Sequence, residues 1–161
     1  MGAGKTTVGK LLAQEIGYAF IDLDAVIVTA YDKSINDIFA TEGEPVFRLK
    51  ETEALEQISL TDQTIVATGG GVVISPMNRR LMRESGLVIN LSVTAEQVAK
   101  RLAKDDSRPL LAGSKSVDQI ESLLESRKFF YADADMIVDT KSKTPEEITH
   151  EILLWLKTMK C

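Results

Sequence analysis

The sequence of 161 residues predicts an α/β protein, with a short parallel sheet covered by helices on both faces in three α/β/α layers. Two observations favour this class. Short apolar runs suited to buried strands alternate with stretches whose apolar residues recur at helical spacing, and this alternation implies parallel strands. The chain also begins with Gly2-Ala-Gly-Lys-Thr6 directly before an amphipathic helix, which is typical of a phosphate-binding loop.

The helices are predicted from apolar spacing and from residues that start or stop a helix. Gly17 ends the first helix, Ser34 is a candidate N-cap for the third, and Pro45 suits the first turn of the fourth. Thr94 and Thr144 each open a capping box with a Gln or Glu three residues later. The predicted helices cover residues 5–16, 25–31, 35–41, 44–58, 76–84, 94–104, 116–131 and 144–157.

Apolar runs between these helices predict strands at residues 18–22, 64–68, 87–91 and 136–139. The full phosphate-loop pattern has a further glycine five residues before Gly4 and normally follows a buried strand. Because the sequence starts at Met1, we expect this N-terminal strand to be absent from the chain. We therefore expect its neighbours in the sheet to have unpaired, apolar edges.

Composition limits the possible function classes. The chain is 44% hydrophobic and 27% charged, which suits one soluble domain spanning residues 1–161. Its net charge of −5 argues against a nucleic-acid or membrane partner, and no apolar run approaches the roughly 20 residues of a membrane span. The only cysteine is Cys161 and the only histidine is His150, so we expect a cytoplasmic protein with no disulfide and no histidine-pair metal site. We also expect the protein to be a monomer.

The first residues predict the nucleotide site. Glycines let backbone N–H groups approach phosphate oxygens, and a helix N-terminus favours negative charge. Lys5 can reach the β- and γ-phosphates of ATP, and the hydroxyl of Thr6 can ligate Mg²⁺. The predicted site comprises Gly2, Ala3, Gly4, Lys5, Thr6 and Thr7. Two alternatives are a glycine-rich N-terminus that happens to precede a helix and a myristoylation signal.

Two carboxylates, Asp22 and Asp24, follow the first predicted strand. Period-two alternation places both on one side, at the carboxyl edge where ligands bind in open α/β sheets. One can hold Mg²⁺ through water while the other accepts a proton from a substrate hydroxyl. In the alternative interpretation, Asp24 caps the next helix and Asp22 is merely solvated.

Two further features are candidates for substrate binding. Arg48 and Glu51 are three residues apart on a predicted helix, so the guanidinium can grip a substrate carboxylate while Glu51 fixes its rotamer. The alternative is a surface ion pair worth about 1 kcal/mol at most. The run Gly69, Gly70 and Gly71 follows a strand and can bring backbone N–H groups to a ligand, or it is a plain turn.

Two more arginines are candidates. The polar stretch 104–115 is predicted to be a lid loop in which Arg108 neutralises charge on a transferred phosphoryl group; a solvated loop arginine is the alternative. Arg127 lies in the predicted helix 116–131 and is either a second anion-binding residue or an exposed one.

Taken together, the chain resembles the shikimate kinase family of P-loop, nucleoside-monophosphate-kinase-like enzymes. The resemblance rests on the order and spacing of Gly2-Ala-Gly-Lys-Thr6, Asp22-Leu-Asp24, Phe47-Arg48 with Glu51, Thr68-Gly-Gly-Gly71, Arg108-Pro-Leu-Leu111 and Arg127. It implies a P-loop kinase fold and transfer of the γ-phosphoryl group of ATP to the 3-hydroxyl of shikimate, a step towards chorismate and the aromatic amino acids.

The resemblance also implies residue roles. Lys5 and Thr6 would hold phosphate and Mg²⁺, with Asp22 placing the metal through water, and Asp24 would be the base. Shikimate would bind beside the helical region 24–58, with its carboxylate held by two arginines. The other implied contacts are Arg48, Glu51, Gly70, Gly71 and Arg127 for shikimate, Arg108 for the transferred phosphate, and Arg101, Lys143 and Pro145 near adenine.

Two rival functions stay open at this point. Another small-molecule kinase of the same architecture, for example one acting on gluconate, would share the phosphate loop. A non-catalytic relative that binds a ligand or partner is the other, because the phosphate-loop pattern is incomplete.

Overall fold

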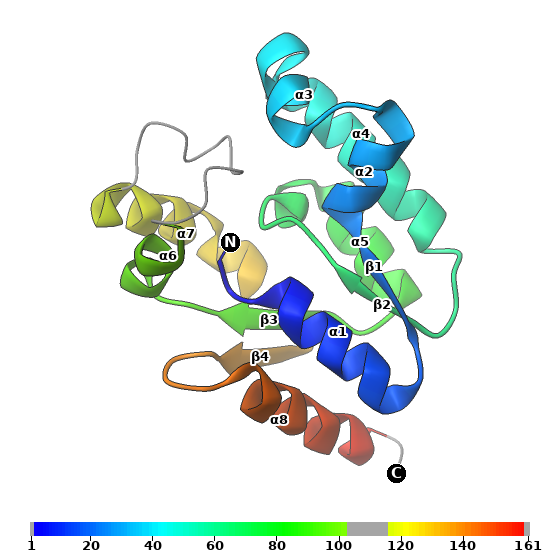
Figure 1. Ribbon diagram of the computed structural model, residues 1–161, viewed down its shortest axis with the longest axis vertical. Coiled ribbons are helices and arrows are strands. Elements are labelled where there is room, and N and C mark those ends of the chain that lie inside the picture. The colour runs from blue at the N-terminus through cyan, green and yellow to red at the C-terminus, as the bar shows by residue number, and fades with distance from the viewer. Residues whose placement is uncertain (1, 103–115, 160–161) are drawn as a thin grey trace.

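The computed structural model describes residues 2–102 and 116–159, and it has the predicted α/β architecture (Figure 1). The strands are β1 (Ala19–Asp22), β2 (Thr64–Ala67), β3 (Ile89–Ser92) and β4 (Met136–Asp139). The helices are α1 (Lys5–Ile16), α2 (Leu23–Tyr31), α3 (Ile35–Thr41), α4 (Gly43–Ile58), α5 (Pro76–Ser85), α6 (Ala95–Leu102), α7 (Val117–Tyr131) and α8 (Pro145–Thr158), with a short 3-10 helix, η1 (Val72–Ile74).

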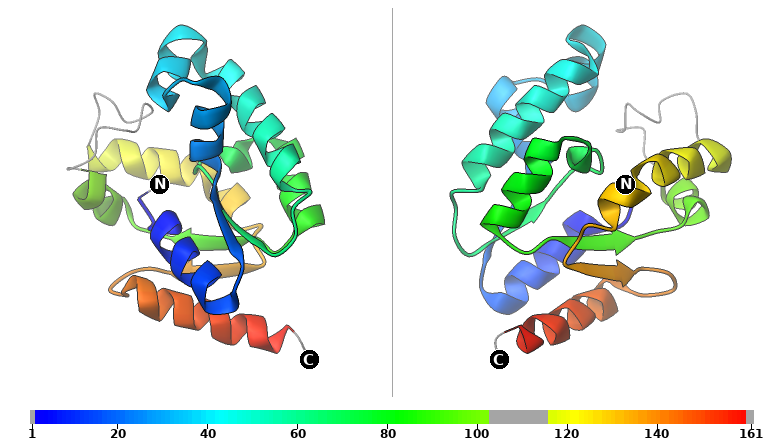
Figure 2. Two further views of the ribbon diagram at one scale, coloured as in Figure 1. Left: turned by 45° about the vertical axis from the view of Figure 1, so that its right-hand side comes forward. Right: turned by 180° about the vertical axis from the view of Figure 1, so that it is seen from behind.

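All the pairings among the described strands are parallel, but they form two pairs instead of one sheet. β1 lies beside β2, with Ala19 opposite Thr64, and β3 lies beside β4, with Ile89 opposite Met136. Seen from behind, α5 and α7 lie in front of the strands and α1 lies behind them (Figure 2). The three-layer arrangement is therefore confirmed, while the continuous sheet is not.

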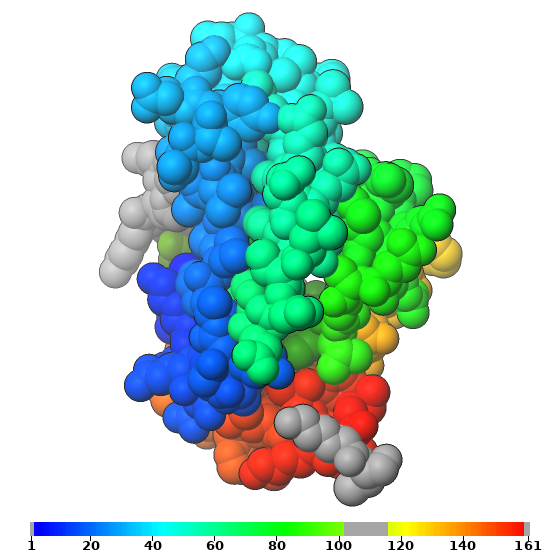
Figure 3. All heavy atoms as spheres, turned by 90° about the vertical axis from the view of Figure 1, so that its right-hand side faces the viewer, coloured from blue at the N-terminus to red at the C-terminus, as the bar shows by residue number. Residues whose placement is uncertain are grey.

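A cleft separates the two pairs of strands. It has a volume of about 240 Å³ and is lined by Val66 of β2, Ile89 of β3, and Val8 and Leu12 of α1. On the surface, a hollow lies between α4 and α5 (Figure 3). Within the described part of the chain no strand lies between β2 and β3, so their edges are unpaired, as the sequence predicted.

Two hydrophobic clusters lie on either side of this cleft. One joins α2, α3 and α4 around Leu23, Ile27 and Phe47. The other joins α1, α8, β3 and β4 and includes Leu12 and Ile152. Because α1 packs against both β2 and α8, it connects the two halves through side chains.

Local signals set most element boundaries correctly. The hydroxyl of Ser34 accepts from the N–H of Asp37, and Thr144 forms the predicted capping box with Glu147. Most bounds differ from prediction by one residue at most. The larger differences are that β3 begins at Ile89, two residues later than expected, that η1 was not predicted, and that α2 begins directly after β1. No helix of residues 2–102 and 116–159 is long and apolar enough to cross a bilayer.

The packing of α8 on α1 yields a stability prediction. The side chain of Ile152 is 1% exposed, whereas that of Leu154 on the same helix is 50% exposed. We expect Ile152→Ala to lower the free energy of unfolding by about 2–5 kcal/mol, because it leaves a cavity in the cluster. Leu154→Ala is the matched control and should cost about 1 kcal/mol or less. Urea unfolding of both variants measures the difference, and equal losses would contradict this packing.

Candidate active site

The phosphate loop precedes α1 in a conformation that requires glycine. Gly2 and Gly4 have φ angles of 59° and 85°, a left-handed region that other residues rarely adopt. Ala3 between them is buried in the core, which anchors the loop. The guanidinium of Arg101 in α6 donates to the carbonyl of Gly2 at 2.5 Å. The first N–H groups of α1 are therefore presented at a helix N-terminus suited to bind phosphate.

Asp22, the last residue of β1, connects the phosphate loop to α2. Its Oδ2 accepts from the hydroxyl of Thr6 at 3.0 Å. Its Oδ1 accepts from the N–H groups of Asp24 and Ala25 at 3.1 and 3.4 Å, so that Asp22 is the N-cap of α2. This corrects two interpretations of the sequence: the cap is Asp22 and not Asp24, and Asp24 lies in the first helical turn, where strand alternation does not apply.

The pair Thr6 and Asp22 also offers the kind of ligand that Mg²⁺ prefers. A hydroxyl and a carboxylate oxygen lie together, and Mg²⁺ favours hard oxygen donors completed by water and substrate phosphates. Among residues 2–102 and 116–159 no group of three or more His, Cys, Asp or Glu side chains could hold a metal. The donor set therefore fits a metal shared with a phosphate better than a closed protein site.

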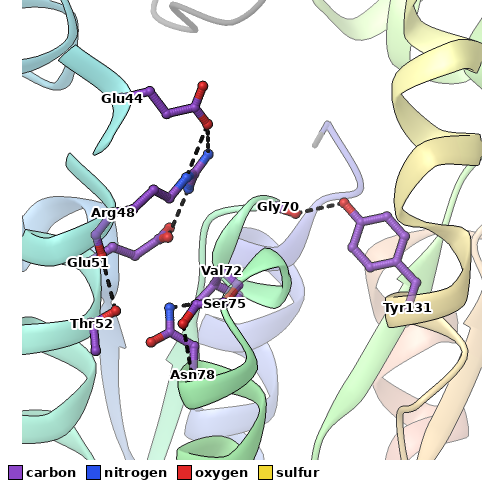
Figure 4. A network of polar contacts seen from close by, with 9 residues as sticks. All are labelled: Glu44, Arg48, Glu51, Thr52, Gly70, Val72, Ser75, Asn78 and Tyr131. Carbon is purple, nitrogen blue, oxygen red and sulfur yellow. Dashed lines mark hydrogen bonds and ion pairs between the residues drawn. The ribbon is translucent and has the colours of Figure 1, made fainter. Parts of the chain in front are cut away.

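A charged cluster lies on the α4 face of the glycine run (Figure 4). The guanidinium of Arg48 donates to Oε2 of Glu51 at 2.8 Å and, on its other side, to Oε1 of Glu44 at 2.9 Å. Glu51 is fully buried. This contradicts the alternative of an ordinary surface ion pair, because the carboxylate is removed from solvent and its partner is held from two sides.

The glycine run packs directly against this cluster. A Cβ at Gly71 would lie 2.6 Å from Cζ of Arg48, and a Cβ at Gly69 would lie 3.2 Å from both Oδ1 of Asp24 and Oε1 of Glu51. The φ of Gly71 is −92°, an ordinary value, so this glycine is required by space and not by backbone strain. A turn with no further role would not need glycines in such close contact with charged side chains.

The electrostatics of Glu51 extend the cluster to α2 and α7. Burial raises the pKa of the Glu51 carboxyl, the cation of Arg48 lowers it, the charge of Asp24 raises it again and Arg127 lowers it; the net shift is upward. Arg127 is only 6% exposed. In the described structure Oε1 of Glu51 has no hydrogen-bond partner. Asp24, Arg48, Glu51 and Arg127, which come from three separate stretches of the sequence, thus belong to one charged cluster.

The remaining predicted site residues lie in other parts of the structure or outside the residues that it describes. Arg108 and the lid 104–115 fall outside the described residues. Lys143 pairs with Glu151 at 2.5 Å, and Pro145 is the first residue of α8. Lys5 and Thr68 line both the cleft and a neighbouring cavity of about 410 Å³ between β3 and α7. His150 is exposed, as an unremarkable surface residue would be.

Sequence reasoning missed three side chains that hold the charged cluster or the backbone of the glycine run and the residues just after it. Glu44 binds Arg48 from the outer side. Asn78 donates to the carbonyl of Val72 at 3.2 Å, and the hydroxyl of Tyr131 donates to the carbonyl of Gly70 at 2.7 Å. One signal was available for Tyr131: it follows Arg127 by one helical turn, so the two share a helix face. Nothing local pointed to Asn78.

A glycine phosphate loop at the start of α1, together with a largely buried charged cluster in a parallel α/β fold, is typical of a P-loop kinase. Within that class, a family model described as shikimate kinase matches residues 1–157. The chain therefore belongs to the shikimate kinase family. It is 46% identical to a shikimate kinase of Geobacter metallireducens over 157 residues, which span 98% of this chain and 88% of that protein.

Solved structures agree with this assignment. The chain is similar to the shikimate kinase of Acinetobacter baumannii in complex with shikimate, with a TM-score of 0.96 and 33% identity over 99% of this chain and 90% of that one. It is also similar to shikimate kinase from Aquifex aeolicus, with a TM-score of 0.85 and 32% identity over 98% and 92% of the two chains.

The raised pKa of Glu51 predicts a pH dependence of stability. From its ordinary value of 4.5 the pKa rises on folding, so the folded protein binds this proton more tightly than the unfolded chain does. Its contribution to stability is therefore lost as pH rises through the folded-state pKa. Relative to Glu51→Gln, the wild type should lose stability as pH rises from the ordinary value of 4.5 through the higher folded-state pKa. Urea unfolding across this range tests the sign; a difference between the two proteins that does not change with pH would contradict it.

Proposed function

We propose that this protein transfers the γ-phosphoryl group of ATP to the 3-hydroxyl of shikimate. One observation carries the proposal: the pair of Arg48 and the buried Glu51 lies against a glycine run at the carboxyl end of β2, and the charge of the buried Arg127 also acts on Glu51. Two cations that are largely shielded from solvent suit a small carboxylate acceptor. The similarity to a shikimate kinase in complex with shikimate supports this identity of the acceptor.

On the nucleotide side, we assign phosphate binding to Gly2, Ala3, Gly4, Lys5, Thr6 and Thr7. The Lys5 ammonium is assigned to the β- and γ-phosphates, where charge must be neutralised as the phosphoryl group leaves. Thr6 and Asp22 would hold Mg²⁺, which supplies charge neutralisation on the phosphates when bound. The hydrogen bond between these two side chains already orients both oxygens.

On the acceptor side, we assign Arg48 and Arg127 to the shikimate carboxylate and Asp24 to the hydroxyl that reacts. Asp24 would accept the hydroxyl proton as the oxygen attacks phosphorus. Glu51 holds the guanidinium of Arg48 at 2.8 Å, which supports an orienting role. The backbone N–H groups of Gly69, Gly70 and Gly71 are assigned to substrate oxygens.

The remaining assignments rest on the family resemblance. Arg108 would close from the lid onto the transferred phosphate, and Arg101, Lys143 and Pro145 would flank adenine. The contact of Arg101 with Gly2 supports this placement. A monomeric, cytoplasmic enzyme without a nucleic-acid partner is consistent with the net charge of −5.

The direct test is ADP release from Mg-ATP by this chain, with shikimate, with gluconate and with neither. We expect release that depends on shikimate. Release that depends on gluconate instead would overturn the acceptor assignment but keep the kinase. Retained ATP binding without ADP release for any acceptor would favour a non-catalytic family member.

Gly71→Ala tests the role of Arg48 in acceptor binding. The new Cβ collides with the guanidinium of Arg48, which is the flexible end of a side chain and can move, so the chain should still fold, with a loss of stability because the pairing with the buried Glu51 is weakened. The displaced cation should raise the KM for shikimate about 10-fold or more, the size expected for losing one charged hydrogen bond, with the KM for ATP nearly unchanged.

The matched control is Gly86→Ala, because a Cβ at Gly86 meets nothing within 4 Å. It should leave both KM values unchanged. Steady-state kinetics give the KM values for shikimate and ATP of each variant, and thermal unfolding shows whether each variant is folded. Equal increases of the two KM values in Gly71→Ala would remove the assigned role of Arg48.

A further inference from the structure

The glycine run is held from the side opposite the charged cluster. The hydroxyl of Tyr131 in α7 donates to the carbonyl of Gly70 at 2.7 Å. Just beyond, Asn78 of α5 donates to the carbonyl of Val72 at 3.2 Å, and Arg79 donates to the carbonyl of Val73 at 2.6 Å. Figure 4 places Tyr131 on one side of Gly70 and Arg48 with Glu51 on the other.

The bond from Tyr131 fixes the orientation of one peptide group. The Gly70–Gly71 peptide is trans, because the described chain has no cis bonds, so its C=O and N–H point in opposite directions. With the C=O of Gly70 directed to Tyr131, the N–H of Gly71 is directed away from α7. The charged cluster lies on that side, because Arg48 and Glu51 lie across Gly70 from Tyr131 (Figure 4) and a Cβ on Gly71 would lie 2.6 Å from Cζ of Arg48.

A peptide between two glycines has little steric preference of its own, because neither residue carries a Cβ that would restrict φ and ψ. An external hydrogen bond is therefore needed to keep one orientation. Tyr131 is well placed to provide it, because its side chain is partly buried and lies one helical turn after Arg127 on the same face of α7. The helix that carries a buried cation into the pocket thus also holds the glycine run.

We propose that Tyr131 is a positioning residue for the acceptor: its hydroxyl orients the Gly70–Gly71 peptide so that the N–H of Gly71 faces the bound substrate. The inference rests on the proposed function for the identity of that substrate. Tyr131 acts through the backbone and does not contact the reacting atoms. It restricts the peptide before the acceptor binds, which lowers the ordering cost of binding.

The test compares Tyr131→Phe with Tyr18→Phe. Both variants remove one phenolic hydroxyl, but Tyr18 is exposed just before β1, at the opposite end of the strands from the glycine run. We expect Tyr131→Phe to raise the KM for shikimate about twofold to 13-fold, the range of one lost neutral hydrogen bond, while the KM for ATP stays nearly unchanged. Tyr18→Phe should change neither value.

An unchanged KM for shikimate in Tyr131→Phe would overturn the inference, as would a parallel rise of both KM values, which indicates general loosening of the fold. Amide hydrogen exchange over residues 68–74 provides a readout that does not need turnover. Faster exchange in Tyr131→Phe than in Tyr18→Phe supports the positioning role, and equal exchange overturns it. If the wild type released no ADP with shikimate, the proposed function would fail, and the exchange result would still decide whether Tyr131 holds this peptide.

Discussion

Burial of the Glu51 carboxylate is the constraint that the rest of the charged cluster satisfies. Removing a carboxylate from water costs several kcal/mol unless a well-placed cation and hydrogen bonds compensate. Arg48 supplies that cation, and Glu44 holds its guanidinium from the outer side. The arrangement leaves no room for a side chain at Gly71. Packing therefore requires glycine at position 71, in addition to the proposed role of the glycine run in substrate binding. A larger residue there would push the guanidinium of Arg48 away from the backbone.

The nucleotide half of the site is held by different means. No backbone pairing joins β2 to β3 within the described residues, so the position of the phosphate loop depends on α1. That helix is held by apolar packing against α8 and β2, by the buried Ala3 and by the bond from Arg101 to Gly2. The charged cluster is thus positioned by polar contacts and the phosphate loop largely by a hydrophobic cluster.

Local patterns predicted the elements well and the pocket only in part. The helix at 5–16 and the strand at 136–139 were predicted to the residue, because caps, stops and apolar spacing are encoded within each segment. The i, i+3 spacing predicted that Arg48 and Glu51 share a helix face, but the burial of Glu51 depends on Gly69 in another segment. The bond from Tyr131 to Gly70 joins residues 61 positions apart. The spacing of residues within one segment does not predict a contact between distant segments, so only the folded structure reveals it.

The charge distribution explains why the pocket must be built in this way. The chain carries a net charge of −5, while both proposed substrates are anions, so the long-range field of the protein opposes their approach. Binding must then come from cations that act at short range in a low dielectric, where their effect is large and poorly screened by salt. Arg127 is 6% exposed and Arg48 is held between two carboxylates. Arg48 is therefore held in place before a substrate arrives and Arg127 is shielded from solvent, so we expect selectivity to follow from geometry instead of overall charge.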